Sequence, residues 1–455
     1  MGELLSKART ITEPAKEVKV FKEAEVVVVG GGPAGVAAAV AAARNGAQTV
    51  LLERYGHLGG MATGGLVILI PHMSAGGEEQ EVAGICQEMI ERLDAAGGAH
   101  HPRRGDLGST DKKLLSNLRY YNDFVIEGRV RMSVYVDPEI LKCVLNDMVE
   151  EAGVKLFLHS WGSRAVVEGE KVQGVVFESK SGRLATLGKT VIDATGDGDI
   201  FASAGAEFDS TINPELRSST LAVVFRLGNV DFKQFVEFKE SEPEQWNKIM
   251  GEIRSIGNFR LLPLPSSRDD VMWVNNWVPG KDCLNVEDLT WVEVNLRKVM
   301  LPAHEVLKKN VPGFERSFIL DTASQIGTRC SRRLIGEYIV TEKDIRSGIV
   351  HEDTIAVVPP FKRNVSAENP IGCIPYRALV PKRIENLLAT GRCFSSDMVA
   401  NDLLNLIPFC VEMGQAAGIA AALAVKDGVS PRQVNRKALL RRLLDQGAWL
   451  PKALR

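Results

Sequence analysis

The chain has 455 residues, of which 45% are hydrophobic and 25% are charged, and its formal net charge is -2. A chain of this length exceeds the size at which one hydrophobic core stops growing, so two domains are expected. The near-neutral charge and the lack of a long apolar run predict no nucleic-acid partner and no membrane partner. The seven cysteines include no CxxC pair, which indicates free thiols, a cytoplasmic location and no metal site.

A polar arm over residues 1–24 opens the chain and ends in a short apolar stretch, Val18–Phe21, which is typical of an edge strand. Such an arm packs either against the body of its own chain or against a neighbouring subunit. We therefore expect a homo-oligomer.

A buried strand and a glycine turn come next. Four consecutive valines, Val26–Val29, suit a strand covered on both faces, and Gly30, Gly32 and Gly35 follow with GxGxxG spacing. The first glycine permits a sharp turn, the second permits close approach to a pyrophosphate, and the third permits close packing of a helix on the strand. The alanine-rich stretch Pro33–Asn45 is the predicted helix, and its N-terminus favours a diphosphate.

A second strand and an acidic residue complete this nucleotide-binding pattern. Thr49–Leu52 is the predicted strand, and it delivers Glu53, whose carboxylate can accept hydrogen bonds from a ribose. Glu53 would serve the ribose of NAD as well as that of FAD. The five glycines between Arg54 and Gly65 favour FAD, because they let the backbone wrap a ligand that extends beyond the ribose.

The rest of this region combines an insert with further strands. Residues 71–130 are expected to form the insert, and a helix is predicted after it over Pro138–Glu151. The strand Thr190–Thr195 then breaks into small residues and Gly196, which lets the chain pass a cofactor closely. We assign residues 25–206 to the first and second segments of a nucleotide-binding domain.

The composition changes in residues 207–364, which contain four of the six tryptophans and a cluster of arginines, Arg329, Arg332 and Arg333. We expect a separate substrate or cap domain here. Neighbouring guanidinium groups hold carboxylates well, because their forked donors match the carboxylate geometry. The alternative that these arginines bridge domains or face solvent remains open at this point.

The last part of the chain returns to the pattern of the first. Asn386–Arg392 is an apolar strand that ends at a glycine, residues 397–408 are expected to form a loop, and Phe409–Val425 is a second helix of small residues. The N-terminus of that helix can stabilise negative charge on an electron-rich ring. We expect residues 365–430 to form the third segment of the nucleotide-binding domain and residues 431–455 to form a helical tail.

Six motifs in this order resemble the FAD-dependent oxidoreductase family, within the glutathione-reductase-like and fumarate-reductase-like flavoprotein superfamily. The motifs are VVVVGGGPAGVAAA, ERYGHLGGMATGG, VIDATGDGDIFASAGA, IGTRCSRRLIGEY, IPYRALVPKRIENLLATGRC and MGQAAGIAAALA, and the resemblance covers about residues 10–430. It implies an α/β fold with a three-layer Rossmann-like FAD-binding domain built from discontinuous segments. It also implies an inserted α+β substrate domain and FAD as the cofactor.

The resemblance assigns residues to the cofactor position by position. The glycine turn would face the pyrophosphate, Glu53 would hold the adenosine ribose, and residues 405–407 would approach the pyrimidine edge of the flavin. The implied cofactor residues are Gly30, Gly32, Pro33, Ala34, Gly35, Glu53, Arg54, Gly60, Met61, Thr63, Trp161, Gly162, Ala194, Thr195, Gly196, Gly391, Arg392, Asn405, Leu406 and Ile407.

The chain departs from the family pattern in the loop expected at the flavin face. Where many members read THEALGSVRV, this chain reads DMVANDLLNL from Asp397 to Leu406, which indicates a specialised pocket. Asp397 is therefore the leading candidate for a catalytic acid or base, and Arg329 and Arg332 are candidates for holding an anion. His57 lies where a covalent link to the flavin is conceivable, but a packed histidine and non-covalent FAD are the simpler expectation.

The expected activity is hydride transfer between a small organic substrate and N5 of the flavin, because the cofactor carries the redox chemistry. One alternative is a flavin-bearing subunit that passes electrons to a partner protein. The other is a flavin-dependent enzyme that modifies RNA, which the neutral charge and the lack of a basic stripe disfavour.

Overall fold

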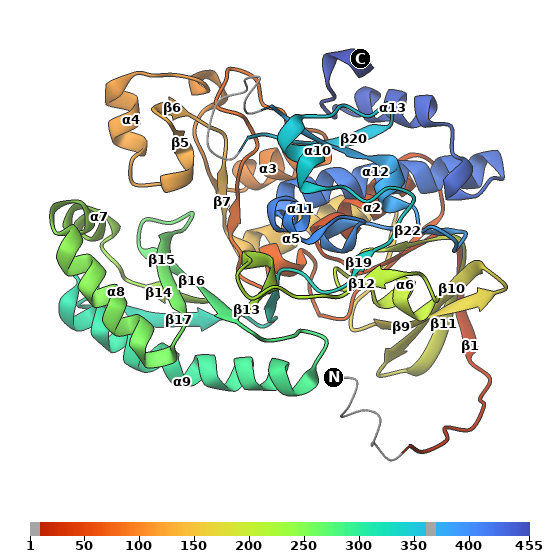
Figure 1. Cartoon of the computed structure of the whole chain (residues 1–455), viewed down its shortest axis with the longest axis horizontal. Helices are drawn as coiled ribbons and strands as arrows, with labels where there is room; N and C mark the ends of the chain where they lie inside the picture. Colours follow the sequence, from red (N-terminus) through yellow and green to blue (C-terminus); the bar gives the residue numbers. More distant parts are fainter. Residues whose placement is uncertain (1–9, 361–369) are drawn as a thin grey trace.

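The computed structural model describes residues 10–360 and 370–455 (Figure 1). The domain boundary expected between residues 364 and 365 lies outside the described residues, as do the first nine residues of the N-terminal arm. Two larger sheets organise the described chain, and Figure 1 shows them on opposite sides of the molecule.

The larger of these sheets has seven strands and carries the glycine turn. Its strands lie in the order β8–β2–β1–β11–β10–β9, with β22 paired to the end of β11. The strands from β8 to β11 and β22 run parallel, whereas β11, β10 and β9 form an antiparallel meander. The strands are β1 (Lys19–Val29), β2 (Thr49–Leu52), β8 (Lys155–Phe157), β9 (Trp161–Glu168), β10 (Lys171–Ser179), β11 (Gly182–Asp193) and β22 (Leu387–Ala389).

The central strand, β1, begins earlier than the sequence predicted. The expected edge strand at Val18–Phe21 and the valine run form one strand, because both parts pair with β11. The side chains of the valine run alternate between two hydrophobic clusters, with Val26 and Val28 in one and Val27 and Val29 in the other. This alternation is the period of two expected for a strand that is covered on both faces.

Two helices from distant parts of the sequence lie side by side against this sheet, α2 (Pro33–Arg44) and α12 (Ile407–Asp427) (Figure 1). Glycines on α12 permit the close contact. A Cβ atom at Gly414 would lie 2.1 Å from the carbonyl oxygen of Ala34, and one at Gly418 would lie 2.1 Å from that of Ala38. Only residues without a side chain fit at these positions, so the glycines fix the distance between the helices.

The apolar length of α12 has a structural explanation. By length and composition α12 is the one helix in the described ranges that could cross a membrane. However, 94% of its most apolar window is buried inside the protein, against α2 and the larger sheet. The composition of α12 is therefore that of a core helix.

The second sheet is antiparallel and has six strands in the order β17–β14–β16–β13–β18, with β15 paired to β16. Aromatic side chains fill the core beside it: the ring centroid of Phe235 lies 5.2 Å from that of Trp246 and 5.4 Å from that of Phe314. The elements are β13 (Thr220–Ala222), β14 (Phe225–Gly228), α7 (Phe232–Ser241), α8 (Pro243–Gly257), β15 (Arg260–Pro265), β16 (Val271–Pro279), α9 (Val286–Asn310), β17 (Phe318–Thr322) and β18 (Gly327–Thr328).

Short elements fill the spaces around the two sheets. A three-stranded sheet, β3–β7–β4, and helices α3 and α5 lie between the glycine turn and the meander in the sequence. These and the remaining elements are β3 (Leu69–Ile70), α3 (Ile85–Ala95), β4 (Ala99–His100), α4 (Lys112–Leu118), β5 (Val125–Ile126), β6 (Arg129–Val130), β7 (Val134–Val136), α5 (Pro138–Glu151), α6 (Asp199–Ser203), β12 (Phe208–Asp209), β19 (Arg333–Leu334), α10 (Glu342–Ser347), β20 (Thr354–Val358), β21 (Gly372–Pro375), α11 (Met398–Leu404) and α13 (Arg436–Asp445).

One predicted loop is a helix. Residues 397–408 were expected to be irregular, but α11 occupies most of this stretch. Asp397 is its N-cap, and the Asp397 carboxylate accepts a hydrogen bond of 2.7 Å from the backbone N–H of Ala400. An aspartate at this position stabilises the first turn of a helix by about 1 kcal/mol, which explains why the helix begins there.

Candidate active site

A cavity lies between the glycine turn, the end of β11, the N-terminus of α12 and the second sheet. It encloses about 1480 Å³ of space including its opening. Most of the residues that the sequence assigned to a cofactor line it. These are Gly30, Gly32, Pro33, Ala34, Glu53, Arg54, Gly60, Met61, Trp161, Gly162, Ala194, Thr195, Gly196, Gly391, Arg392, Asn405, Leu406 and Ile407.

The three glycines of the turn have different roles. Gly30 has φ of +101°, and a Cβ atom there would lie 2.4 Å from the carbonyl oxygen of Ala194 at the end of β11. A Cβ atom at Gly32 would meet nothing within 4 Å, so this residue keeps the floor of the cavity open. Gly35 was expected to face the pyrophosphate, but it does not line the cavity. A Cβ atom there would lie 1.7 Å from the carbonyl oxygen of Gly30, so Gly35 lets α2 pack onto the turn.

Two helix N-termini meet at the cavity. The N-cap residues are Gly32 for α2 and Leu406 for α12, and neither provides a side-chain cap. Each helix has a proline in its first turn, Pro33 and Pro408. The positive ends of two helix dipoles and the backbone N–H groups of their first turns therefore face one space, which suits a ligand with negative charge at two places.

The acidic residue at the end of β2 is held in place by backbone N–H groups. Glu53 is buried, and its carboxylate accepts hydrogen bonds of 2.5 Å from Gly31 and 2.7 Å from Tyr55. Burial raises the pKa of Glu53, and these hydrogen bonds oppose the rise. Because a carboxylate has about four acceptor positions, Glu53 can still accept hydrogen bonds from a ligand hydroxyl. Trp161 lines the same end of the cavity and is 56% exposed.

An arginine reaches the cavity beside the end of β11. Arg392 donates a 2.7 Å hydrogen bond to Asp197, which also accepts one of 2.8 Å from the Ser331 hydroxyl. Burial raises the pKa of Asp197, but Arg392, Arg54 and Ser331 together outweigh this effect, and the net shift is downward. Among the described residues the buried Nε atom of Arg392 has no partner, so it can donate to a ligand. Gly196 makes room for this side chain, because a Cβ atom there would lie 2.7 Å from the guanidinium carbon.

Two further arginines, Arg217 and Arg329, lie at the other end of the cavity. Arg329 donates to the carbonyl oxygen of Asn276 at 3.2 Å, and its own carbonyl oxygen accepts a hydrogen bond of 3.1 Å from Asn405. Arg217 donates to the side-chain oxygen of Asn405 at 2.6 Å and lies 3.6 Å from the carboxylate of Asp402. Asn405 therefore connects the N-terminus of α12 to both arginines.

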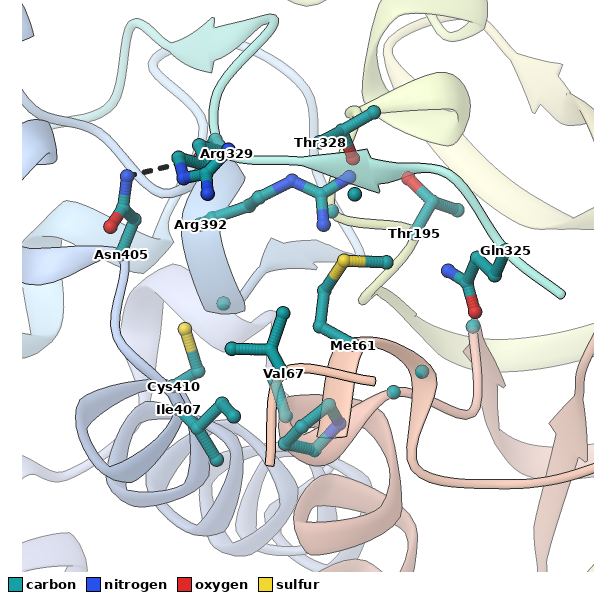
Figure 2. A pocket seen from close by; sticks show the side chains of 18 of the residues that line it. Met61, Val67, Thr195, Gln325, Thr328, Arg329, Arg392, Asn405, Ile407 and Cys410 are labelled. Atoms are coloured by element: carbon teal, nitrogen blue, oxygen red, sulfur yellow. Dashed lines mark hydrogen bonds between the residues drawn. The ribbon is translucent and has the colours of Figure 1, made fainter. Parts of the chain in front are cut away.

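The polar and apolar linings of the cavity are separated. Figure 2 shows Asn405, Arg329 and Arg392 along one wall, and Met61 and Ile407 on the opposite wall. The tryptophan-rich second sheet closes the end of the cavity near Arg329 with Trp273 and Trp277. A ligand that extends beyond the nucleotide residues meets both kinds of surface.

Several sequence candidates lie outside the cavity lining. The Asp397 carboxylate caps α11 and also accepts a 2.9 Å hydrogen bond from the backbone N–H of Glu342, so no free carboxylate reaches the cavity from this position. Arg332 forms an ion pair with Asp199 at 2.9 Å. We therefore carry neither Asp397 nor Arg332 forward as a catalytic candidate.

The two remaining candidates near the glycine loop are packed among protein groups. The ring of His57 stacks on that of Tyr55, with centroids 5.7 Å apart, and burial lowers the His57 pKa. Thr63 is buried and donates a 2.5 Å hydrogen bond to the carbonyl oxygen of Leu58. Neither residue lines the cavity, so His57 is an ordinary packed histidine in this structure.

Some lining residues gave no signal in the sequence. Arg217 belongs to no motif, and its place depends on Asp402, 185 residues later. Asn275 and Gln325 lie in segments that were assigned only to a substrate domain. The excess of tryptophan in that region could have pointed to Trp273 and Trp277. Among the described residues no group of three or more potential metal ligands is present.

A comparison with curated proteins found no match. Among solved structures, p-nitrophenol 4-monooxygenase PnpA from Pseudomonas putida DLL-E4 is 13% identical, with a TM-score of 0.50 and coverage of 93% of this chain and 86% of that one. A geranylgeranyl bacteriochlorophyll reductase-like protein from Thermoplasma acidophilum is 14% identical, with a TM-score of 0.46 and coverage of 93% and 87%. The expected α/β flavoprotein fold is thereby confirmed.

The family model described as "FAD dependent oxidoreductase" matches residues 25–443, which is nearly the whole chain. The cavity geometry agrees with this match, because the uncapped helix ends, the held carboxylate of Glu53 and the unpartnered Nε atom of Arg392 suit a dinucleotide. The chain belongs to the FAD-dependent oxidoreductase family, and FAD is its cofactor.

Proposed function

We propose that the protein transfers a hydride between a small organic substrate and N5 of FAD. The observation that carries this proposal is the continuity of the cavity, which is lined at one end by the glycine turn and at the other by Arg217, Trp273 and Trp277. A substrate at the second end would lie in the same enclosed space as the cofactor. Bound FAD supplies the redox chemistry, and the protein supplies binding, orientation and exclusion of water.

Within this proposal, each part of the cofactor has a set of residues to hold it. Gly32 and the N-terminus of α2 would bind the diphosphate, and Glu53 would accept hydrogen bonds from the ribose. Trp161 would cover the adenine. The N-terminus of α12 would stabilise negative charge on the pyrimidine edge of the flavin. We propose that these segments form the discontinuous, three-layer Rossmann-like FAD-binding domain that the resemblance implies.

The location of the cofactor can be tested by filling the floor of the cavity. Because a Cβ atom at Gly32 meets no protein atom and its φ of -68° suits any residue, Gly32→Val should fold normally and lose FAD. Gly251→Val is the matched control, since Gly251 lies in α8 with nothing near its Cβ position. The measurement is the absorbance of bound flavin per protein, after purification, dialysis against FAD and removal of the unbound FAD. Equal FAD content in both variants would contradict this placement.

The reaction can be tested by anaerobic titration. We expect at least one class of small organic substrate to bleach the oxidised flavin, with product formed in equal amount to the FAD reduced. If no organic substrate bleaches it while a reduced partner protein does, the chain is an electron-transfer subunit instead.

We also propose that the chain acts in the cytoplasm as a homo-oligomer. Apolar side chains on the outer side of α9 support self-association, since Val294 is 47% exposed and Leu301 is 61% exposed. The molar mass in solution, measured by light scattering, tests this proposal. A monomer at micromolar concentration would refute it.

A further inference from the structure

Positive charge is left uncompensated at the substrate end of the cavity. Arg217 and Arg329 both line it, and Asp402 is the carboxylate beside them. Asp402 pairs with Arg217, at 3.6 Å from its Nε atom, and also accepts a hydrogen bond from the backbone N–H of Ser218. Two guanidinium groups and one carboxylate give this end of the cavity a net charge of one positive unit.

The partners of Arg329 are all neutral. One terminal nitrogen donates to the carbonyl and hydroxyl oxygens of Thr220, at 3.4 and 3.2 Å, and the other donates to Asn275 and Asn276 at 3.3 and 3.2 Å. In the described part of the chain no ion pair joins Arg329 to a carboxylate. Burial and the nearby charge of Arg217 lower the pKa of Arg329 to about 9. A buried cation of this kind is costly unless a ligand pairs with it.

The same end of the cavity also has aromatic and apolar side chains. The guanidinium of Arg329 lies 5.5 Å from the ring centroid of Trp277, and Trp273 lines the cavity nearby. Val67 and Leu69 add apolar side chains from the segment after the glycine loop, and Figure 2 shows Val67 opposite the arginine wall.

One buried polar atom of these side chains has no protein partner. The Nε1 atom of Trp273 is buried without a hydrogen bond among the described residues, in a side chain that is 3% exposed. Buried polar groups are rarely left unsatisfied. A ligand that fills this end of the cavity would explain this atom.

We infer that the substrate is a small aromatic monocarboxylate, with its carboxylate held by Arg329 and Arg217 and its ring packed against Trp273 and Trp277. This inference rests on the proposed function and names its substrate class. A monoanion neutralises the single excess charge, whereas a phosphate dianion would leave the site negative. Both terminal nitrogens of Arg329 already donate to protein oxygens, so this residue would hold the carboxylate through its charge.

The first experiment measures binding of three probes to the FAD-loaded protein. Benzamide shares the ring and the planar head group of benzoate but not its charge, and acetate shares its charge but not its ring. Each probe is titrated by isothermal calorimetry and by the flavin difference spectrum. We expect the Kd of benzoate to be at least about tenfold lower than the Kd of benzamide and of acetate. Equal binding of benzoate and benzamide would overturn the carboxylate assignment.

Variants locate the binding group. Arg329→Gln removes the unpaired charge and should raise the Kd of benzoate at least about tenfold, while leaving that of benzamide within about twofold. Arg329→Lys keeps the charge but loses hydrogen bonds that position it, so its Kd should be intermediate. Arg226→Gln is the matched control, because Arg226 lies in β14 of the second sheet, is already paired with Asp321 and does not line the cavity. Its Kd for benzoate should not change.

A variant that is expected to strengthen benzoate binding keeps the test decisive if Arg329→Gln fails to fold. Asp402→Asn removes the one negative charge beside the arginines and should lower the Kd of benzoate. An increase in that Kd would overturn the inference. The proposed function fails separately: if benzoate binds as expected but no organic substrate reduces the flavin anaerobically, the anion site stands and the hydride-transfer proposal does not.

Discussion

The contact between α2 and α12 makes a quantitative prediction for Gly414→Ala. A Cβ atom at Gly414 would lie 2.1 Å from the carbonyl oxygen of Ala34, whereas ordinary contact begins at 3.4 Å. The obstructing atom belongs to a helix backbone, so the helices must separate by more than 1 Å. Such overpacking costs about 1–3 kcal/mol, and the higher helix propensity of alanine returns about 1 kcal/mol. At the upper end of this range, the free energy of unfolding should fall by about 2 kcal/mol in total.

The same change should weaken cofactor binding, because Ala34 lines the cavity at the N-terminus of α2. The assays are the urea midpoint of unfolding and the Kd of FAD, measured by fluorescence quenching on reconstitution. Gly251→Ala is the control, since its Cβ position in α8 is open and the change should raise stability by up to about 1 kcal/mol. If Gly414→Ala is as stable as Gly251→Ala and binds FAD equally well, the close helix contact is not what positions the site.

Three further predictions follow from single side chains. Asp397→Ala should lower stability by about 1–2 kcal/mol through loss of the α11 cap, while the rate of flavin reduction in the folded fraction stays within about twofold; a large loss of rate at full FAD occupancy would restore Asp397 as a catalytic candidate. Trp161→Ala should raise the Kd of FAD several-fold with little effect on the unfolding midpoint, because the side chain is 56% exposed; an unchanged Kd would exclude contact with the adenine. Burial raises the pKa of Glu81 to about 7, so the folded state holds its proton more tightly than the unfolded state. The free energy of unfolding should therefore fall as the pH rises from about 5 to 7. Glu81→Gln should reduce this dependence of the unfolding free energy on pH, measured by urea titrations at several pH values.

Local patterns in the sequence predicted the nucleotide-binding half of the fold well. A run of β-branched residues, a glycine turn and an alanine-rich helix each determine their own backbone, so the valine run of β1, the Gly30 turn and α2 lie where they were expected. Both helices of small residues were also located within two residues at each end. These features depend on contacts between residues that are close in sequence.

The missed features depend on distant partners. Asp397 was interpreted as a candidate acid, but one of its acceptor oxygens is engaged by Glu342, 55 residues earlier in the chain. Arg217 is positioned by Asp402, and no motif surrounds it. A side chain that is recruited by tertiary contacts leaves no periodic signal for sequence analysis to detect.

The pairing of α2 with α12 also determines when the protein can acquire its cofactor. The first helix leaves the ribosome before the second, on the order of a minute earlier at about 5–20 residues per second. Until then, the Ala34 and Ala38 carbonyl groups have no α12 glycines to pack against. The cavity is therefore complete only after α12 has been made, and a chain truncated before residue 407 lacks the lining residues Ile407 and Cys410.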